Sequence, residues 1–300
     1  MPARRFYVIV NPAASRGHAL GAWEPARRVL DAASAEYEVA LTERPRHATE
    51  LAERAARDGW SAVVAVGGDG TVHEVANGLL RASAGETTRP LGIIGVGTGN
   101  DFIKRLGLPR RHPAKAAARL LHAEPRQVDA GRLDEEYFTN GVGVGFDARV
   151  AIEARRVRGL RGMAVYAAAL VRVLRHHRTP RMRLHLDGRL IVDRPLTLIT
   201  VANGPCHGGG FWLCPDARLN DGALDLCVAD ALTPAQLLPL VPRVMRGTHV
   251  TRPDVQMLRG HSVHISSDEP LPVHADGEIY SEAAHELKLE VLPGRLTVLV

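Results

Sequence analysis

The feature that most constrains this chain is a fully apolar run that ends in a glycine-rich loop. Residues 61–66 (SAVVAV) have the composition of a strand that is buried on both faces of a parallel sheet. The loop 67–71 (GGDGT) follows at once, and residues 71–80 then show helical spacing of their apolar positions. This order predicts a strand, a tight loop and a helix, which together form one βα unit.

The same alternation of short strands and helices extends over the first 126 residues. Strands are expected at 6–10, 37–41, 61–66 and 91–96, and helices at 21–33, 48–59 and 71–80. Within the first of these helices, Pro25 is tolerable only in the first turn. Strand–helix alternation predicts a doubly wound α/β domain with a parallel sheet.

After Gln127 the pattern changes to short strands separated by Gly, Pro, Asn and Asp. These strands are expected at 181–188, 196–203, 223–230, 262–267, 286–292 and 296–300, with helical insertions near 160–177 and 233–246. We therefore expect an α/β domain over 1–126 and an antiparallel, β-sandwich-like domain over 127–300. The sequence leaves open whether the last strand returns to the first domain.

Composition adds mainly exclusions. The chain has 300 residues, 45% of them apolar, which suffices for two cores. It lacks a run of about 18 apolar residues, so no transmembrane helix is expected, and the apolar stretch at 6–10 is too short for a signal peptide. Three cysteines without a CxxC pair indicate a reducing, cytoplasmic setting without zinc.

The charge balance is dominated by arginine, because only three of the 38 basic residues are lysine. Arginine excess is compatible with phosphate recognition, but abundant alanine beside it favours a GC-rich genome as the main cause. Aromatic residues make up 4% of the chain and no nucleic-acid-binding motif is present, so nucleic acid is not expected as a partner.

The GGDGT loop has the physical properties of a phosphate cradle. Its glycines let the backbone come close to a ligand, and the following helix N-terminus favours an anion. It matches neither GxxxxGK[ST] nor GxGxxG. Asp69 would repel phosphate unless Mg²⁺ or a proton-relay role compensates. A tight turn with an aspartate helix cap is the alternative interpretation.

A second glycine loop, 97–101 (GTGND), follows the next expected strand. Thr98, Asn100 and Asp101 could cap a helix or contact a ligand. Because consecutive parallel strands end at the same edge of a sheet, both loops should lie where ligands bind. A plain βα turn remains the alternative for this loop alone.

Together these segments resemble a known family. VVAVGGDGTVHEVANGLL (63–80) and LGIIGVGTGNDFIKRLGLP (91–109) are similar to the bacterial diacylglycerol-kinase-type lipid kinases, which are related to sphingosine kinase catalytic domains and distantly to NAD kinases. The similarity continues in NPAASRG (11–17), NGVGVGFDA (140–148), 201–226 and HADGE (274–278). Two departures are Gly95-Val96, where the family often has Pro-Leu, and Arg16, where glycine is frequent.

The resemblance implies Mg²⁺–ATP as donor and a lipid hydroxyl as acceptor, with the nucleotide between the two domains. It assigns the nucleotide site to Asn11, Ser15, Thr42, Gly67, Gly68, Asp69, Gly70, Thr71, Val72, His73, Thr98 and Asn100. It places Asp276 and Glu278 at the catalytic position, with Asp69 as a further catalytic residue. It also implies a Mg²⁺ loop in LNDGA, formed by the Asp221 carboxylate and the main-chain carbonyls of Arg218 and Ala223.

The chemistry of these residues leaves alternatives open. A carboxylate in reach of a lipid alcohol can orient it and take its proton late. Asp276 and Glu278 share this role in our interpretation, with a slight preference for Asp276. The alternative is that Asp276-Gly277 forms only a hairpin turn and Glu278 pairs with an arginine.

The LNDGA loop also has two interpretations. Its oxygen donors suit a hard cation, with Asp216 and Asp225 acting through water. The alternative is a turn capped by Asn220 and Asp221.

The segment 153–178 is the densest basic stretch of the chain. As a helix it could rest on the anionic inner face of the membrane, which a peripheral lipid kinase must visit. The alternative is a core-facing helix with a solvated basic face.

Two other functions compete with the lipid kinase: a soluble-metabolite kinase of the NAD-kinase type and a non-enzymatic binder. The sequence identifies neither the lipid nor the oligomeric state, and a homodimer is compatible with it.

Overall fold

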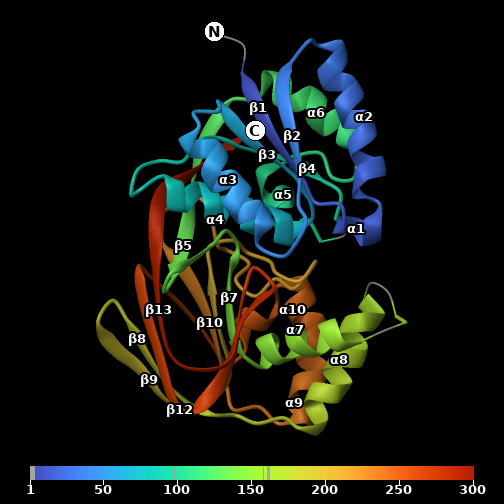
Figure 1. Cartoon of the computed structure of the whole chain (residues 1–300). Coiled ribbons are helices and arrows are strands. Elements are labelled where there is room, and N and C mark those ends of the chain that lie inside the picture. The colour runs from blue at the N-terminus through green and yellow to red at the C-terminus, as the bar shows by residue number, and fades with distance from the viewer. Residues whose placement is uncertain (1–3, 98, 158, 161–162) are drawn as a thin grey trace. The chain divides into compact units, whose positions relative to one another are not determined.

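The computed structural model describes residues 4–97, 99–157, 159–160 and 163–300, without the side chains of Arg16 and Met163. The chain divides into two compact units. Unit 1 contains Met1–Ala130 together with Leu292–Val300, and unit 2 contains Gly131–Val291. Figure 1 shows both units with most of their helices and strands labelled. The division falls four residues after the expected boundary at 126, and the final strand residues belong to unit 1.

Unit 1 is built on a parallel sheet in the order β2-β1-β3-β4-β13. Its strands are β1 (Arg5–Val10), β2 (Glu36–Leu41), β3 (Ala62–Gly67), β4 (Leu91–Gly95) and the last part of β13 (Glu278–Leu299). Every residue of β3 and β4 is buried, as their apolar composition predicted. The α/β fold class expected for this part of the chain is confirmed.

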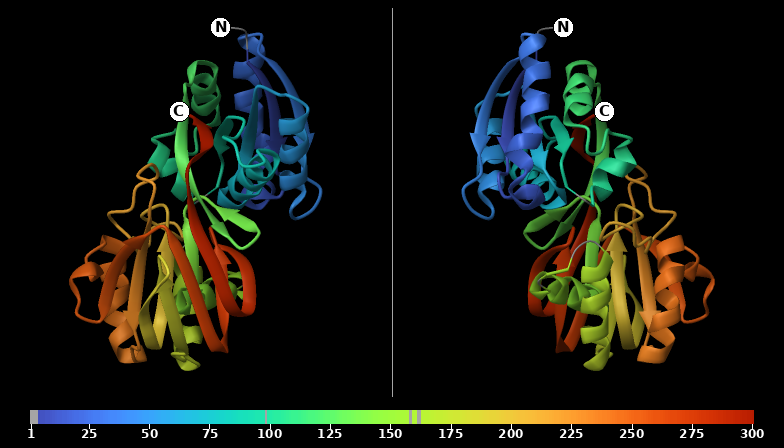
Figure 2. Two further views of the ribbon diagram at one scale, coloured as in Figure 1. Left: turned by 90° about the vertical axis from the view of Figure 1, so that its left-hand side faces the viewer. Right: turned by 90° about the vertical axis from the view of Figure 1, so that its right-hand side faces the viewer.

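Helices cover both faces of this sheet (Figure 2). They are α1 (Ala14–Gly17), α2 (Ala19–Ala32), α3 (His47–Arg57), α4 (Asp69–Ala82), α5 (Asp101–Leu106) and α6 (Pro113–His122). Trp23 and Leu30 of α2 share one core with Phe6 and Val8 of β1. Helices α3 and α4 pack against each other, and both contact β3.

Pro25 does not lie in the first turn of its helix, contrary to the sequence expectation. Helix α2 begins at Ala19, which places Pro25 in the second turn. Proline removes one backbone donor and crowds the carbonyl of residue i−4 there. The helix persists because Trp23, Ala26 and Leu30 on its inner face are buried against the sheet.

Unit 2 is a β-rich domain whose long strands pair with several neighbours. Its sheet runs β11-β10-β9-β7-β12-β13, and β8 pairs with both β9 and β12. Strand β5 (Pro125–Leu133) begins in unit 1 and ends in unit 2. The other strands are β6 (Glu136–Phe138), β7 (Gly141–Gly145), β8 (Arg181–Leu186), β9 (Arg189–Ala202), β10 (Leu224–Asp230), β11 (Val255–Gly260) and β12 (Ser262–Ala275), with the first part of β13. Their inward side chains, such as Val144, Leu184 and Ile199, form one apolar core. This confirms the expected β-rich second domain.

The strands expected at 286–292 and 296–300 are parts of the single strand β13. The sequence suggested a break because Pro293-Gly294 separates them. Gly294 instead continues the strand with φ +62°, and its N–H donates to Asp129 Oδ1 at 2.8 Å. At this point a side-chain oxygen, instead of a carbonyl of a neighbouring strand, therefore accepts the Gly294 N–H.

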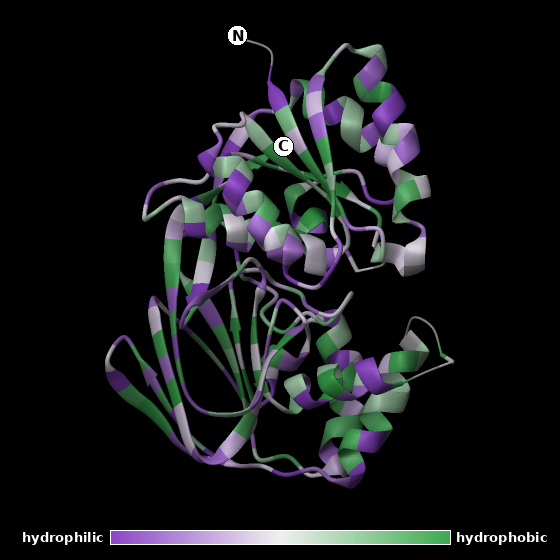
Figure 3. Cartoon of the chain, in the orientation of Figure 1, coloured by the Kyte–Doolittle hydropathy of each residue, from purple (hydrophilic) through white to green (hydrophobic). Residues whose placement is uncertain are grey.

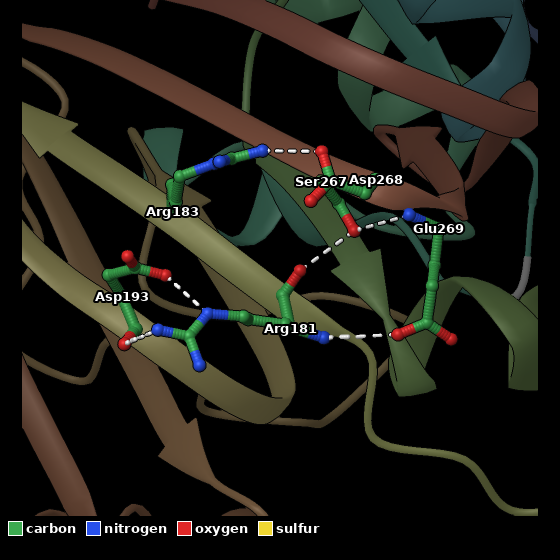
Figure 4. Close-up of polar contacts among 6 residues, drawn as sticks. All are labelled: Arg181, Arg183, Asp193, Ser267, Asp268 and Glu269. Atoms are coloured by element: carbon green, nitrogen blue, oxygen red, sulfur yellow. Dashed lines mark hydrogen bonds and ion pairs between the residues drawn. The ribbon is translucent and has the colours of Figure 1, made fainter.

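Strand β12 changes its register between Ser266 and Leu271, where a polar cluster holds it (Figure 4). Ser267 Oγ donates to the Arg181 carbonyl at 2.8 Å and accepts from the Glu269 N–H at 3.1 Å. The Asp268 carboxylate accepts from Arg183 at 2.6 Å. These contacts let β12 pair with β8 before the irregularity and with β7 after it.

The helices of unit 2 are α7 (Phe146–Arg156), α8 (Met163–Arg175), α9 (Pro234–Leu237), α10 (Val241–Arg246) and two short 3₁₀ turns, η1 (Leu238–Leu240) and η2 (His249–Thr251). The sequence suggested a single helix over the basic segment 153–178, but the structure has two helices there. Helix α7 ends at Arg156, Val157 is extended, and Gly159 has φ +81°.

Figure 3 shows that α8 is mostly hydrophobic, with hydrophilic positions between the apolar ones. Over the residues that the structure describes, no helix combines the length and the hydrophobicity needed to cross a membrane.

Candidate functional site

The two glycine loops of unit 1 touch each other. Strands β3 and β4 end side by side, with Gly67 paired to Gly95. A Cβ atom on Gly97 would lie 2.7 Å from the Gly68 Cα, so only glycine fits this approach of two backbones. The loops that the sequence placed at one edge of the sheet are therefore in direct contact.

Asp69 links these two loops through its side chain. Its Oδ2 accepts the Asn100 N–H at 2.7 Å, and its Oδ1 accepts the Asp101 N–H at 2.8 Å. A carboxylate at the N-terminus of α5 is favoured by the exposed N–H groups there. Asp69 thus caps the helix of the other loop, rather than the helix α4 that it begins.

Asn11 joins the first loop of the chain to this arrangement. Its Nδ2 donates to Thr71 Oγ1 at 3.0 Å, and its Oδ1 accepts the Ala13 N–H at 3.0 Å. The Thr71 side chain lies over Gly67, where a Cβ atom would be 2.2 Å from its Oγ1. The Thr42 N–H donates to the Val10 carbonyl at 2.9 Å, which places Thr42 where β1 ends.

The remaining residues assigned to the nucleotide site differ in exposure. Val72 and His73 are buried in α4, and His73 Nε2 lies 3.4 Å from Asn77 Nδ2. Ser15 is exposed and has φ +52°. Asn100 is buried, and its Nδ2 donates to the Gly97 carbonyl at 2.8 Å. Thr98 lies outside the described residues.

In unit 2, Asp276 forms the turn between β12 and β13. Asp276 and Gly277 both have positive φ, +51° and +86°, as in a two-residue hairpin turn. The two carboxylate oxygens of Asp276 accept four hydrogen bonds. These come from the N–H groups of Thr139, Asn140 and Gly141 and from Thr139 Oγ1, at 2.8–3.1 Å.

Glu278 points to a different element from Asp276. Its Oε2 lies 2.5 Å from Arg155 Nη2 of α7, and the same guanidinium donates to the Gly277 carbonyl at 3.2 Å. The hairpin turn and the Glu278–arginine pair of the alternative interpretation are therefore both present. The two carboxylates that the sequence placed at the catalytic position thus contact different elements, the segment 139–141 for Asp276 and α7 for Glu278.

His274 contacts this turn, and Asp147 lies next to His274. The Gly277 N–H donates to His274 Nδ1 at 3.2 Å, so the neutral ring carries its proton on Nε2. That nitrogen is 3.7 Å from Asp147 Oδ2, and this oxygen accepts a hydrogen bond from Thr200 Oγ1 at 3.2 Å. A Cβ atom on Gly143 would lie 2.1 Å from Asp147 Oδ2, which explains a glycine of the NGVGVGFDA segment.

The LNDGA loop brings carboxylates near an arginine that the sequence did not suggest. Arg259 of β11 pairs with Asp225 of β10 in strand register, and its Nη2 lies 2.5 Å from Asp221 Oδ2. Burial raises the pKa of Asp225, with Arg259 opposing and Asp221 and Asp216 adding to the shift. Among the described residues, Asp225 Oδ2 is buried and has no hydrogen-bond partner.

This donor set fits a hard cation only in part. The orphaned Asp225 oxygen and the nearby Asp221 carboxylate are suitable ligands, but Arg259 already supplies positive charge to Asp221. The described residues contain no group of three or more His, Cys, Asp or Glu side chains arranged to hold a metal. Arg218 is exposed and Ala223 is buried. Their predicted role uses the main-chain carbonyl oxygen, so it does not depend on the side chain.

Sequence reasoning missed the partners of the key carboxylates. Thr139 and Arg155 carry no local signal, because they lie more than a hundred residues from Asp276 and Glu278. Asn140 and Asp147 lie in NGVGVGFDA, a segment that carries the family resemblance, so this segment was the signal that could have identified them.

Comparison with known proteins follows the same division of the chain. The family model described as "Diacylglycerol kinase catalytic domain" matches residues 5–133. The model described as "YegS C-terminal NAD kinase beta sandwich-like domain" matches residues 140–300.

Individual relatives agree with these matches. A diacylglycerol kinase of Mycobacterium tuberculosis is 34% identical over 257 residues, which is 84% of this chain and 81% of the relative. A Bacillus anthracis protein described as a diacylglycerol kinase has a crystal structure with a TM-score of 0.82 at 26% identity, covering 100% of this chain and 98% of the other. An NAD kinase of Archaeoglobus fulgidus, solved with ATP, shares the fold at a TM-score of 0.53 and 16% identity, over 99% and 93% of the two chains.

Proposed function

Because this chain belongs to the diacylglycerol kinase family, we propose that it transfers the γ-phosphate of ATP to the hydroxyl of diacylglycerol or a related lipid alcohol. The observation that carries the proposal is the pair of touching glycine loops, 67–71 and 97–101, joined by the Asp69 carboxylate. The family makes this chain a kinase; the donor, the acceptor and the site residues are our proposal.

The loop pair would receive the phosphates of ATP. Glycine backbone and the start of the 14-residue helix α4 suit an anion. Asp69 should repel phosphate less than a free carboxylate would, because two backbone N–H groups donate hydrogen bonds to it. Asn11 and Thr71 would fix the wall of the site beside Gly67.

The acceptor hydroxyl needs a carboxylate that orients it and takes its proton late in the transfer. We assign this role to Asp276, with Glu278 as the second candidate. Four donors hold the Asp276 carboxylate in one orientation, which suits a positioning group. Glu278 is the second candidate because its carboxylate is paired with Arg155.

Mg²⁺ would supply charge neutralisation for the phosphates when bound with ATP. For the structural Mg²⁺ loop we propose Asp221 and Asp225 as the side-chain ligands. The addition of MgCl₂ without nucleotide should then raise the Tm of the wild-type protein more than that of Asp225→Asn. Equal shifts in both proteins would contradict this ligand set.

The enzyme would meet its lipid as a peripheral protein at the anionic inner face of the membrane. Unit 2 exposes Leu160, Val171 and Leu238, with Arg172 and Arg175 nearby in sequence on α8. Apolar side chains beside arginines suit an anionic lipid surface. Flotation with phosphatidylglycerol vesicles tests this contact: a Val171→Asp variant should float less than Val39→Asp, which changes an exposed apolar residue of unit 1.

One assay tests the central proposal. Purified protein is incubated with Mg²⁺ and γ-labelled ATP in separate reactions that differ in the acceptor. The acceptor is diacylglycerol or another lipid alcohol in detergent micelles, or NAD in buffer. We expect label in the lipid product and none in NADP. Labelling of NAD alone would replace the proposal with the soluble-metabolite kinase, and labelling of neither would reject both.

A further inference from the structure

Unit 2 contains a cavity of about 550 Å³ lined by residues of α7, α8, the β12 irregularity and β13. Four arginines line it, Arg149 and Arg156 from α7 and Arg172 and Arg175 from α8. Two carboxylates, Glu153 and Glu282, also line it. With His176 neutral, the lining carries an excess of two positive charges.

The ion pairs within this lining are unevenly distributed. Glu153 lies 2.8 Å from Arg156 and 3.9 Å from Arg172, and Glu282 lies 3.5 Å from Arg156. Both carboxylates therefore pair with Arg156, and Glu153 also lies near Arg172. In the described part of the chain, Arg149 and Arg175 form no ion pair within 4.0 Å.

Arg149 is the more constrained of these two cations. It is half-buried. Burial lowers its pKa, Arg178 lowers it further, and Glu269 acts in the opposite direction. The Glu269 carboxylate accepts the Arg181 N–H at 3.3 Å (Figure 4), and among the described residues it forms no ion pair with Arg149 within 4.0 Å. A half-buried cation beside another cation is stabilised by an anion that completes its solvation.

We propose that this cavity binds a phosphate-bearing anion, whose oxygens accept hydrogen bonds from Arg149 and Arg175. The planar guanidinium groups match the geometry of phosphate oxygens. The positive excess of two suits a phosphomonoester dianion and also accommodates a phosphodiester. The volume lies within the range of about 300–1,000 Å³ of small-ligand sites. The ligand would be either a phospholipid headgroup or a soluble phosphate compound.

This proposal is independent of phosphoryl transfer, so binding is the test. Isothermal titration at constant ionic strength uses two probes, inorganic phosphate and monomeric dihexanoylphosphatidylglycerol. Both probes can also reach the glycine loops of unit 1, so the informative quantity is the difference between variants. Arg149→Met is compared with Arg189→Met, which changes an exposed arginine at the start of β9.

We expect Arg149→Met to weaken binding of at least one probe by about tenfold or more, as for loss of a charged hydrogen bond. Arg189→Met should bind like the wild type. Tighter binding of the lipid probe would assign the site to headgroups, and tighter or equal binding of inorganic phosphate would assign it to soluble compounds. Identical titrations of wild type and Arg149→Met would overturn the proposal.

A second variant keeps the test valid if Arg149→Met does not fold. Glu282 is 62% exposed at its side chain and competes for Arg156. Glu282→Gln should tighten binding of the probe by about two- to threefold, because it removes a surface carboxylate. Unchanged or weaker binding in this variant would argue against an anion site.

Discussion

Two aspartates, Asp69 in unit 1 and Asp276 in unit 2, each bind the backbone of another loop, but the sequence separation from that loop differs. Each carboxylate accepts backbone N–H groups of a neighbouring loop through both of its oxygens. Asp69 reaches 31 and 32 residues along the chain, to the loop after the next strand. Asp276 reaches back 135–137 residues, to the turn between β6 and β7.

The backbone at the two positions also differs. Asp69 is the first residue of a regular helix, whereas Asp276 has φ +51° in a hairpin turn. The Asp69 carboxylate accepts the N–H groups of Asn100 and Asp101, whereas the Asp276 carboxylate accepts the N–H groups of residues 139–141 and the Thr139 hydroxyl. A carboxylate can thus organise a loop in two ways. It can close a short local unit, or it can fasten two segments that only the tertiary fold brings together.

The largest effect is expected for Asp276→Asn. Asparagine tolerates the left-handed backbone, but its amide group turns a donor toward the donors of residues 139–141. We expect kcat/KM for lipid phosphorylation to fall by more than about 100-fold. The protein should remain folded, with the free energy of unfolding lowered by about 1–3 kcal/mol.

Asp268→Asn is the matched control, because Asp268 is an exposed aspartate whose side chain pairs only with Arg183 among the described residues. Activity of Asp276→Asn within a factor of about three of this control would remove Asp276 from the catalytic assignment. Glu278→Gln in the same assay then decides between the two carboxylates.

A smaller loss is expected for Asp69→Asn. One of its two carboxylate hydrogen bonds to Asn100 and Asp101 is lost, which loosens the second glycine loop. A charge-assisted hydrogen bond contributes about 1.5–3 kcal/mol, so kcat/KM for ATP should fall by about 10- to 150-fold. Asp58→Asn, an exposed position just after α3, should leave ATP kinetics unchanged.

Gly97→Ala tests the contact between the loops rather than their charge. The added methyl group would lie 2.7 Å from the Gly68 Cα, so one backbone must move. We expect the free energy of unfolding of unit 1 to fall by about 1–3 kcal/mol in denaturant titrations. Gly21→Ala in α2, where nothing lies within 4 Å, should be neutral or slightly stabilising. Equal stability of the two variants would mean that the loops separate easily.

The smallest effect concerns pH and unit 2. Burial is the main cause that lowers the pKa of His249 and of His177 below 6.5 in the folded protein. The unfolded chain therefore binds more protons, and stability that is present above pH 6.5 is lost as the pH falls below it. His249→Gln should flatten this loss between pH 7.5 and 5.5 in denaturant titrations, whereas exposed His112→Gln should not. A slope that His249→Gln leaves unchanged would contradict this explanation.

The comparison also explains what could be predicted from the sequence. The Asp69 loops were found because glycine, strand and helix signals lie within forty residues of one another. The Asp276 turn was recognisable as Asp-Gly, but its partner Thr139 carries no signal that points to position 276, and Asn140 was marked only as part of the NGVGVGFDA segment. Arg155 and Arg259 were missed for the same reason, since pairing across strands and onto helices is set by the tertiary fold.

Local signals also failed where packing overrode them. Pro293-Gly294 suggested the end of a strand, yet β13 continues through both residues. Pro25 suggested a helix start, yet α2 holds it in its second turn. In both cases buried neighbours stabilise a backbone that the residues alone would not choose.

The course of β13 has a consequence for how the protein is made. Residues 292–300 belong to unit 1, where Val298 pairs with Leu91 of β4 and the Thr297 N–H donates to Thr88. During synthesis the first four strands of that sheet are complete long before residue 298 leaves the ribosome. Until then β4 presents an open, apolar edge of the kind that recruits foreign strands. A fragment that ends near residue 130 would keep this edge permanently, so attempts to express the first unit alone should yield aggregates unless residues 292–300 are grafted back.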